Sequence, residues 1–337
     1  MLDIFNDDAF SVVSLTDAIN KVAFKPGRIS SLGLFQETGV ATTTISVEQK
    51  EDMLILVPPT PRGAPGTTID KGKRSMLAIN VPHFEIDDAV MAEEVQNIRA
   101  FGTETQLDNV VRVVGERLAI HAQSLAATEE HARIGAIKGV ITYADGSTLN
   151  LFSTFGVSQI SELAFDLTNK KDGDVRAFCA GVTRTIATEL GGLPFSGVMC
   201  LASDSFFDGL LKNAEVRASY LNQQEARELR NAYLEAGQSY GRFEFGGIVF
   251  ENYRGSVGAT KFVADDKCHL FPLGVPGLFR TVHAPADYME TVNTLGRKLY
   301  AKQFPMPNDK GVSMEVQTNA LHYCTRPRVL LKGKVGA

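Results

Sequence analysis

Cysteine is scarce in this sequence, and its cysteines are scattered. The chain of 337 residues has four of them and no C-x-x-C pair. This spacing argues against a disulfide framework and against a structural zinc site. We expect all four to be small buried apolar side chains: Cys179, Cys200, Cys268 and Cys324.

Long apolar runs, a basic leader and an excess of positive charge are also absent. No run reaches the roughly 18 residues that span a bilayer, and residues 1–8 are acidic where a secretory signal would be basic. The net charge is −5, from 34 basic and 39 acidic residues. We therefore expect a protein of the cytosol, with no membrane segment and no basic patch for gripping DNA.

Motifs that carry catalysis are missing. The sequence has no G-x-G-x-x-G after a predicted strand, no G-x-x-x-x-G-K-[ST] and no G-x-S-x-G. His121 and His131 share a predicted helix without the H-E-x-x-H spacing of a zinc site. Cys268 and His269 are neighbours on a predicted strand and so point to opposite faces. The sequence thus predicts no enzyme, no cofactor and no metal ligand.

Pairs of adjacent acids have a plainer interpretation. Glu93-Glu94 and Glu129-Glu130 are typical of a solvated helix face, and Asp87-Asp88 is typical of the start of a helix, where the dipole favours negative charge.

Composition describes an ordinary globular protein, with 44% hydrophobic and 22% charged residues. The chain is longer than most domains that have a single hydrophobic core, which predicts two lobes or an elongated body. Residues 1–40 have few apolar anchors, and we expect them to form an arm that leans on a neighbouring surface.

An extended hairpin is predicted over residues 41–86. Alternating apolar residues at 42–48 and 76–86 indicate two strands, and residues 58–75 between them are dense in Pro and Gly. This tip carries a net charge of +3, from Asp70 and four basic residues: Arg62, Lys71, Lys73 and Arg74. An isolated ribbon is marginal in water, so we expect it to lie on another surface, although an ordinary hairpin with a mobile loop is the alternative.

The strongest helix signal covers residues 104–133, where apolar residues recur every three or four positions. At 1.5 Å per residue this helix is about 40 Å long, suited to the spine of a thin subunit. A glycine break at Gly135 and Gly139 follows, and then a hairpin around Asp145-Gly146. Residues 172–300 alternate between helix and strand patterns, which completes an α+β fold.

The last quarter of the chain resembles a known family. Pro285-Ala286-Asp287-Tyr288, then Glu290, Val292-Asn293-Thr294, Gly296 and Tyr300-Ala301-Lys302, is similar to the major capsid protein E family of tailed bacteriophages, the lambda-type shell subunit. The resemblance continues through Lys310-Gly311, Glu315, Gln317, Asn319 and Leu321.

This resemblance implies the tailed-phage (Hong Kong 97-like) major capsid fold. On this sequence it places an N-terminal arm at 1–40, an extended loop at 41–86 and an axial domain at 172–300. The peripheral domain, with the spine helix at about 104–133, takes residues 87–171 and 301–337.

The implied function is structural: self-assembly into hexamers and pentamers that form an icosahedral head around double-stranded DNA. The implied partners are further copies of the chain, a scaffolding or protease protein, a portal and a decoration protein, and assembly takes place in the host cytoplasm. We expect contact between subunits at the four basic tip residues, at Phe84 and Ile86 on the return strand of the hairpin, and at Glu93 and Glu94. We expect hinges at Gly102, Gly135 and Gly139.

Two alternatives remain at the level of the sequence. One is the shell of a cellular nanocompartment with the same fold, which would need an internal groove for cargo peptides. The other is an unrelated α/β enzyme, which would show a deep polar pocket with a perturbed acid or histidine. For Phe84 and Ile86, the alternative is a core within their own chain.

Overall fold

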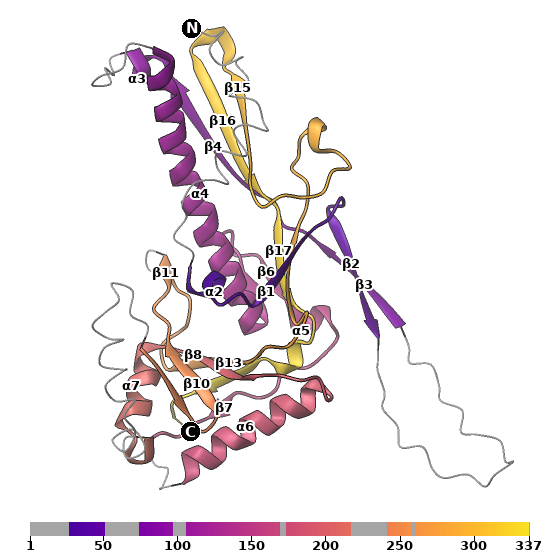
Figure 1. Ribbon diagram of the computed structural model, residues 1–337, viewed down its shortest axis with the longest axis vertical. Coiled ribbons are helices and arrows are strands. Elements are labelled where there is room, and N and C mark those ends of the chain that lie inside the picture. Colours follow the sequence, from indigo (N-terminus) through magenta and orange to yellow (C-terminus); the bar gives the residue numbers. More distant parts are fainter. Residues whose placement is uncertain are drawn as a thin grey trace, which may run out of the picture.

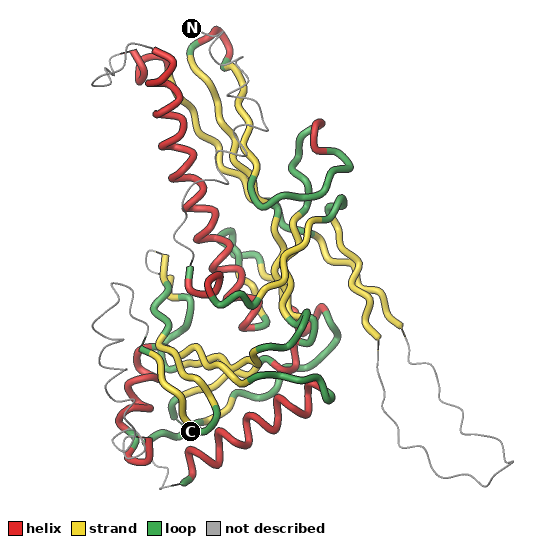
Figure 2. The backbone as a smooth tube through the Cα atoms, viewed as in Figure 1, coloured by secondary structure: helices red, strands yellow, loops and turns green. Residues whose placement is uncertain are grey.

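The computed structural model describes residues 27–50, 74–96, 106–168, 173–216, 241–257 and 260–336. The body is elongated, with a sheet-based lobe at one end and a long helix beside a strand hairpin at the other (Figure 1). A two-stranded ribbon projects from the side of this body. Helices and strands are interspersed along the chain (Figure 2), which confirms the predicted α+β class.

The lobe is built on a six-stranded sheet in the order β7-β18-β13-β8-β10-β9. Helices α6 (Asp174–Leu190) and α7 (Asp204–Lys212) lie beside it in Figure 1. Because β7 and β18 come from outside the predicted axial range of 172–300, the sheet draws on more of the chain than that range. The strands are β7 (Leu163–Ala164), β8 (Gly197–Ala202), β9 (Arg242–Phe245), β10 (Ile248–Asn252), β13 (Lys267–Leu273) and β18 (Leu331–Lys334).

The largest core cluster fills this lobe. The Phe165 ring packs edge-on against Phe206, with the ring centroids 5.0 Å apart, and both side chains are fully buried. Helix α6 contributes a buried stripe with helical spacing that includes Val175, Val182 and Ile186. All four cysteines are free and buried, as the sequence predicts.

Helix α4 (Gln106–Lys138) is the spine of the molecule. It continues past the predicted end at residue 133, and Gly135 lies inside it, so the predicted break at this position is wrong. A Cβ at Gly135 would lie 2.7 Å from the Cα of Ile141, and only glycine lets the helix approach this neighbouring strand so closely. The helix ends at Lys138, and Gly139 follows it with a left-handed φ of +82°.

A three-stranded antiparallel sheet in the order β15-β16-β4 lies along the far half of α4. Its strands are β4 (Phe84–Met91), β15 (Tyr300–Pro305) and β16 (Gly311–Thr318). A second core cluster joins this sheet to the helix, with Val114 and Leu118 from α4 and Met314 and Val316 from β16. This cluster gives the thin half of the body its own apolar interior.

The return strand of the hairpin ends earlier than predicted. β2 (Thr44–Lys50) pairs with β3 (Arg74–Asn80), and β4 then starts afresh at Phe84 and pairs with β16. Phe84 and Ile86 therefore lie outside the ribbon and pack against the α4 cluster within their own chain. Asp87-Asp88 is likewise in the middle of β4 rather than at the start of a helix, because the alternating pattern continues through it.

A middle sheet, β1-β14-β17, connects the two ends of the body. Its strands are β1 (Phe35–Gly39), β14 (Phe279–His283) and β17 (Ala320–Cys324), and β1 runs parallel to β14. The predicted hairpin at Asp145-Gly146 is confirmed as β5 (Val140–Thr142) and β6 (Thr148–Asn150). The remaining short elements are α2 (Arg28–Ser31), α3 (Ala92–Gln96), α5 (Leu151–Thr154), β11 (Ser256–Val257), β12 (Thr260–Lys261), η3 (Met289–Thr291), η4 (Pro307–Asp309) and η5 (Pro327–Val329).

Candidate functional site: surfaces for contact between subunits

The β2–β3 ribbon is the most prominent candidate contact surface. It forms a sheet of only two strands among the described residues, so each strand leaves one edge without a partner strand there. Ile45 and Ile79 are buried and join the main core at its root, whereas Met76 further along is 77% exposed. An open edge with an exposed apolar side chain is a template for another chain.

Most of the predicted basic tip falls outside the described residues. Arg62, Lys71 and Lys73 lie there, as does the hinge candidate Gly102. Arg74 begins β3 opposite Lys50, and its side chain is not among those described. The structure therefore shows the β2–β3 ribbon, and the contacts of the basic tip residues with another subunit stay predictions.

The predicted acidic partners lie on α3, at the far end of the spine. Glu94 forms an ion pair with Arg117 of α4, and Arg117 also lies 2.9 Å from Asp88. Glu93 is exposed, and no ion pair is found for it within the described residues. Glu93 is thus better placed than Glu94 to receive a basic group from another chain.

The acids at Glu129 and Glu130 are buried, so the prediction of a solvated helix face is wrong for this pair. The Glu130 carboxylate accepts hydrogen bonds from the backbone N–H of Ile29 at 2.7 Å and from the Tyr253 hydroxyl at 3.2 Å. These donors come from distant parts of the chain, and they satisfy a charge that would otherwise be costly to bury.

A second buried acid fixes the same N-terminal segment. Both carboxylate oxygens of Glu251, on β10, accept hydrogen bonds from the Arg28 guanidinium, at 2.6 and 2.8 Å. The Glu251 side chain is fully buried and that of Arg28 is 25% exposed. The start of the described part of the predicted arm is therefore held to the body of its own chain.

Further along the arm, Glu37 ties β1 to the spine. Its carboxylate lies 2.7 Å from the Arg133 guanidinium and 3.4 Å from the His283 ring. The hydrogen bond with His283 lowers the pKa of Glu37 to about 2, and the charge of Arg133 acts in the same direction against the effect of burial. This acid therefore stays ionised at any physiological pH.

The loop between β14 and β15 presents apolar side chains to solvent. Met289 is 89%, Val292 58% and Leu295 69% exposed, three large apolar residues within seven positions.

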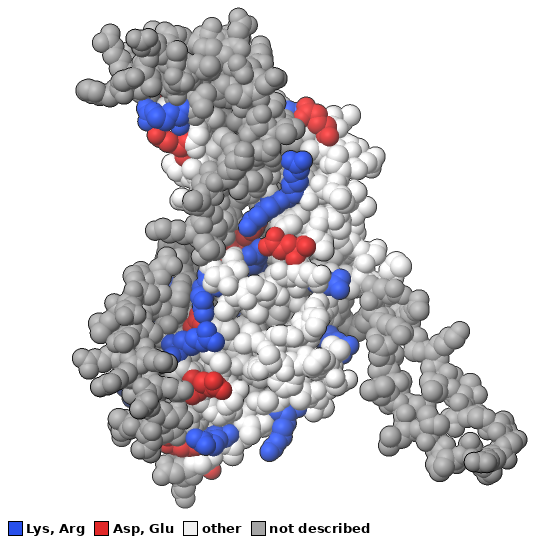
Figure 3. All heavy atoms as spheres, viewed as in Figure 1, with Lys and Arg blue, Asp and Glu red and all other residues white. Residues whose placement is uncertain are grey.

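The charged residues on the face shown in Figure 3 are interspersed in sign and leave a broad area without charge. None of the helices in the described ranges is long and apolar enough to cross a membrane.

A spine helix beside a strand hairpin, a sheet-based lobe and a projecting ribbon together define the tailed-phage capsid fold. Solved structures agree. The crystal structure of a prophage protein of E. coli CFT073 assigned as a capsid protein has a TM-score of 0.61 at 14% identity, over 96% of this chain and 98% of that one.

The chain belongs to the phage major capsid protein E family, whose model matches residues 11–335. It is 25% identical to the major capsid protein of Salmonella phage Felix O1 over 97% of both chains. It is 26% identical to that of Pseudomonas phage KPP10, over 96% of this chain and 97% of that one. The protein is therefore a major capsid protein of a phage and a structural component of the virion.

Proposed function

We propose that this chain tiles the icosahedral head of a tailed phage as hexamers and pentamers around double-stranded DNA. The open-edged β2–β3 ribbon, which projects beyond the body, is the observation that carries this proposal. A ribbon with two free edges buries its backbone groups only against another surface, and neighbouring copies of the same chain supply one.

The ribbon of each subunit lies across the peripheral domain of the next in this proposal. Identical head-to-tail contacts form a closed ring when the rotation from one copy to the next divides a full turn. Each subunit in such a ring is held by contacts on both sides, so each contact can be weak. The basic residues of the tip reach Glu93 on the neighbour. Each exposed ion pair contributes about 0–1 kcal/mol, and the shell repeats it at every subunit.

One sequence must pack around both five-fold and six-fold axes, which requires adjustable joints. Gly139 lies between the spine and β5, and Gly102 lies outside the described residues; both stay hinge candidates. Gly135 is less suited to this role, because it sits inside α4 against Ile141. Rotation at such joints turns the axial lobe relative to the spine.

The inner wall holds DNA without reading its sequence. With a net charge of −5, the subunit offers no general attraction for phosphates, so packaged DNA can slide. Assembly takes place in the host cytoplasm with a scaffolding or protease protein, a portal and a decoration protein, which the family resemblance implies.

Electron microscopy of the purified protein, together with light scattering for mass, tests the proposal. Closed particles, tubes, or rings of subunits support it. Reversal of Lys71, Lys73 and Arg74 to Glu is expected to lower the assembly yield without changing the far-UV circular dichroism of the subunit. Adding Glu93→Lys to this variant is expected to recover part of the yield. Unchanged assembly of the triple variant would rule out the tip contact.

A further inference from the structure

Basic side chains gather where the end of the spine helix meets the six-stranded sheet. In the β13–β18 ladder, His269 stands opposite Lys332, and Lys267 lies two residues before His269 on the same face. Lys138 is the last residue of α4, and its charge acts on the His269 ring because α4 contacts β13. We call Lys138, Lys267, His269 and Lys332 the basic cluster.

The basic cluster carries more positive charge than its neighbours compensate. One carboxylate serves two of the lysines: the Glu162 Oε1 atom lies 2.9 Å from the Lys267 Nζ and 3.3 Å from the Lys332 Nζ. Lys138 donates a hydrogen bond of 3.1 Å to the backbone carbonyl of Phe262, and within the described ranges no carboxylate pairs with it. Three ammonium groups thus share one carboxylate and leave a charge of +2, in a chain whose total is −5.

Partial burial makes this local excess of positive charge unfavourable. The side chains of Lys267 and Lys332 are 28% and 40% exposed. Burial, and after it the charge of Lys332, lowers the pKa of Lys138. Because charges that are partly withdrawn from water are weakly screened by salt, an anion among these ammonium groups would relieve their repulsion.

His269 gives an independent indication that a ligand belongs here. Its side chain is only 5% exposed, and its imidazole ring forms no hydrogen bond with another residue that the structure describes, although buried polar groups are normally hydrogen-bonded. Burial, and after it the charges of Lys138 and Lys332, lowers the pKa of His269 to about 3. The ring is therefore neutral at physiological pH and has one N–H donor. A buried donor without a partner among three cations favours an anionic acceptor.

We propose that the basic cluster binds a phosphate group. Phosphate oxygens are strong acceptors, and lysine binds them as a point charge with three donors. Lys138 uses one of its donors on Phe262, so donors remain for an oxyanion. A phosphate monoester carries about −1.5 to −2 at pH 7, which offsets the excess of positive charge. The cluster lies within one chain, so this site does not depend on the proposed assembly.

Titration calorimetry of the full-length chain with inorganic phosphate tests the proposal, with sodium chloride at the same ionic strength as the reference. We expect a saturable heat, and a melting temperature that rises with phosphate concentration. Lys138→Gln and Lys332→Gln should each weaken binding by about tenfold or more, because charge-assisted hydrogen bonds are strong. Lys302→Gln is the matched control: Lys302 is a partly buried lysine 3.0 Å from Glu290, and its loss should leave the titration unchanged.

A short fluorescent DNA duplex distinguishes the two sources of the phosphate group. If the DNA backbone is the ligand, the duplex binds, and each lysine substitution lowers the slope of log K against log salt by about 1. If the ligand is a free phosphate or a monoester, inorganic phosphate binds and the duplex does not.

The proposal is overturned if neither probe binds, or if the probe that binds does so equally well to Lys138→Gln and Lys332→Gln. Lys332→Arg, which keeps the charge, should retain most of the binding. Since the readout is the response to phosphate, a variant that is only less stable does not mimic a lost site.

Discussion

The Arg28–Glu251 pair allows a quantitative test of how the N-terminal segment is held. Glu251 is fully buried, and Arg28 provides two hydrogen bonds of 2.6 and 2.8 Å to its carboxylate. Arg28→Ala would leave a buried charge without its partner, which costs about 3–5 kcal/mol. Since whole domains are stable by only about 5–15 kcal/mol, the loss should be large.

Urea unfolding of unassembled subunits, followed by far-UV circular dichroism, measures this loss. Arg112→Ala is the matched control, because Arg112 forms an exposed pair with Glu116 one helical turn away, a type worth about 0.3–0.5 kcal/mol. Arg28→Ala combined with Glu251→Gln should recover much of the stability, since a neutral amide is less costly to bury. The reasoning is refuted if Arg28→Ala costs no more than Arg112→Ala.

Three further predictions concern the spine and the root of the ribbon. Gly139→Ala should destabilise the subunit by at least about 1–3 kcal/mol, because φ is +82° and a Cβ would lie 2.3 Å from a packed aromatic ring; an unchanged melting temperature would contradict this. The Leu118 side chain is 3% exposed in the α4 cluster, so Leu118→Ala should lower the free energy of unfolding, measured in urea, by about 2–5 kcal/mol. A loss below about 1 kcal/mol would contradict a packed interior. Burial lowers the pKa of His83, but hydrogen bonds with Asn319 and Glu85 outweigh it, so the pKa is raised above 6.5. The stability from His83 is therefore full below pH 6.5 and lost as the pH rises through the raised value; His83→Gln should flatten this part of the stability curve.

Local patterns in the sequence predict the helices and turns well. The spine helix follows from apolar spacing, and the Asp145-Gly146 hairpin follows from turn chemistry. The error at Gly135 has a physical reason. A glycine can end a helix, but it can also let a strand pack closely against a helix that continues, as at Gly135. The sequence alone does not distinguish these two roles.

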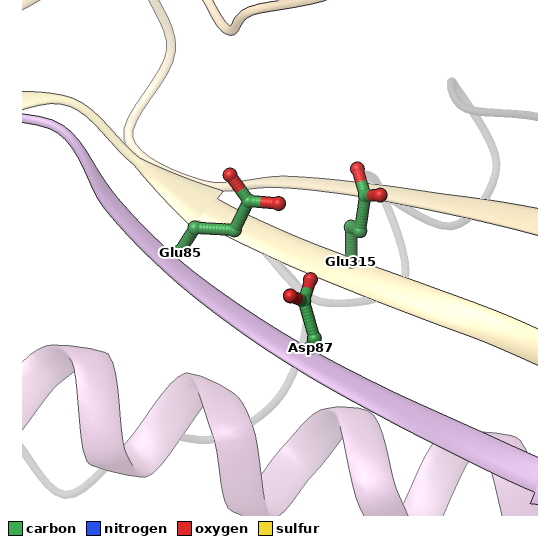
Figure 4. A group of neighbouring side chains, drawn as sticks. All are labelled: Glu85, Asp87 and Glu315. Atoms are coloured by element: carbon green, nitrogen blue, oxygen red, sulfur yellow. The ribbon is translucent and has the colours of Figure 1, made fainter.

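Pairings between distant segments could not be predicted from periodicity. The alternation at 84–91 is visible, yet nothing local says that β4 pairs with β16 rather than with the ribbon. The burial of Glu130 has the same origin, because its donors Ile29 and Tyr253 are about a hundred residues away on either side. The spacing of Glu85 and Asp87 indicates that both side chains lie on one face of β4, and Glu315 joins them only through the register of the sheet (Figure 4).

The position of β18 in the six-stranded sheet has a consequence during synthesis of the protein. β18 is the last of the six strands in the sequence, yet it pairs between β13 and β7 instead of at the margin of the sheet. On the ribosome, the nascent lobe therefore cannot close its sheet until residue 334 has emerged. A prematurely terminated chain would expose the free side of β13, and unpaired strand edges promote aggregation. Closure of this sheet therefore depends on the strand that is synthesised last.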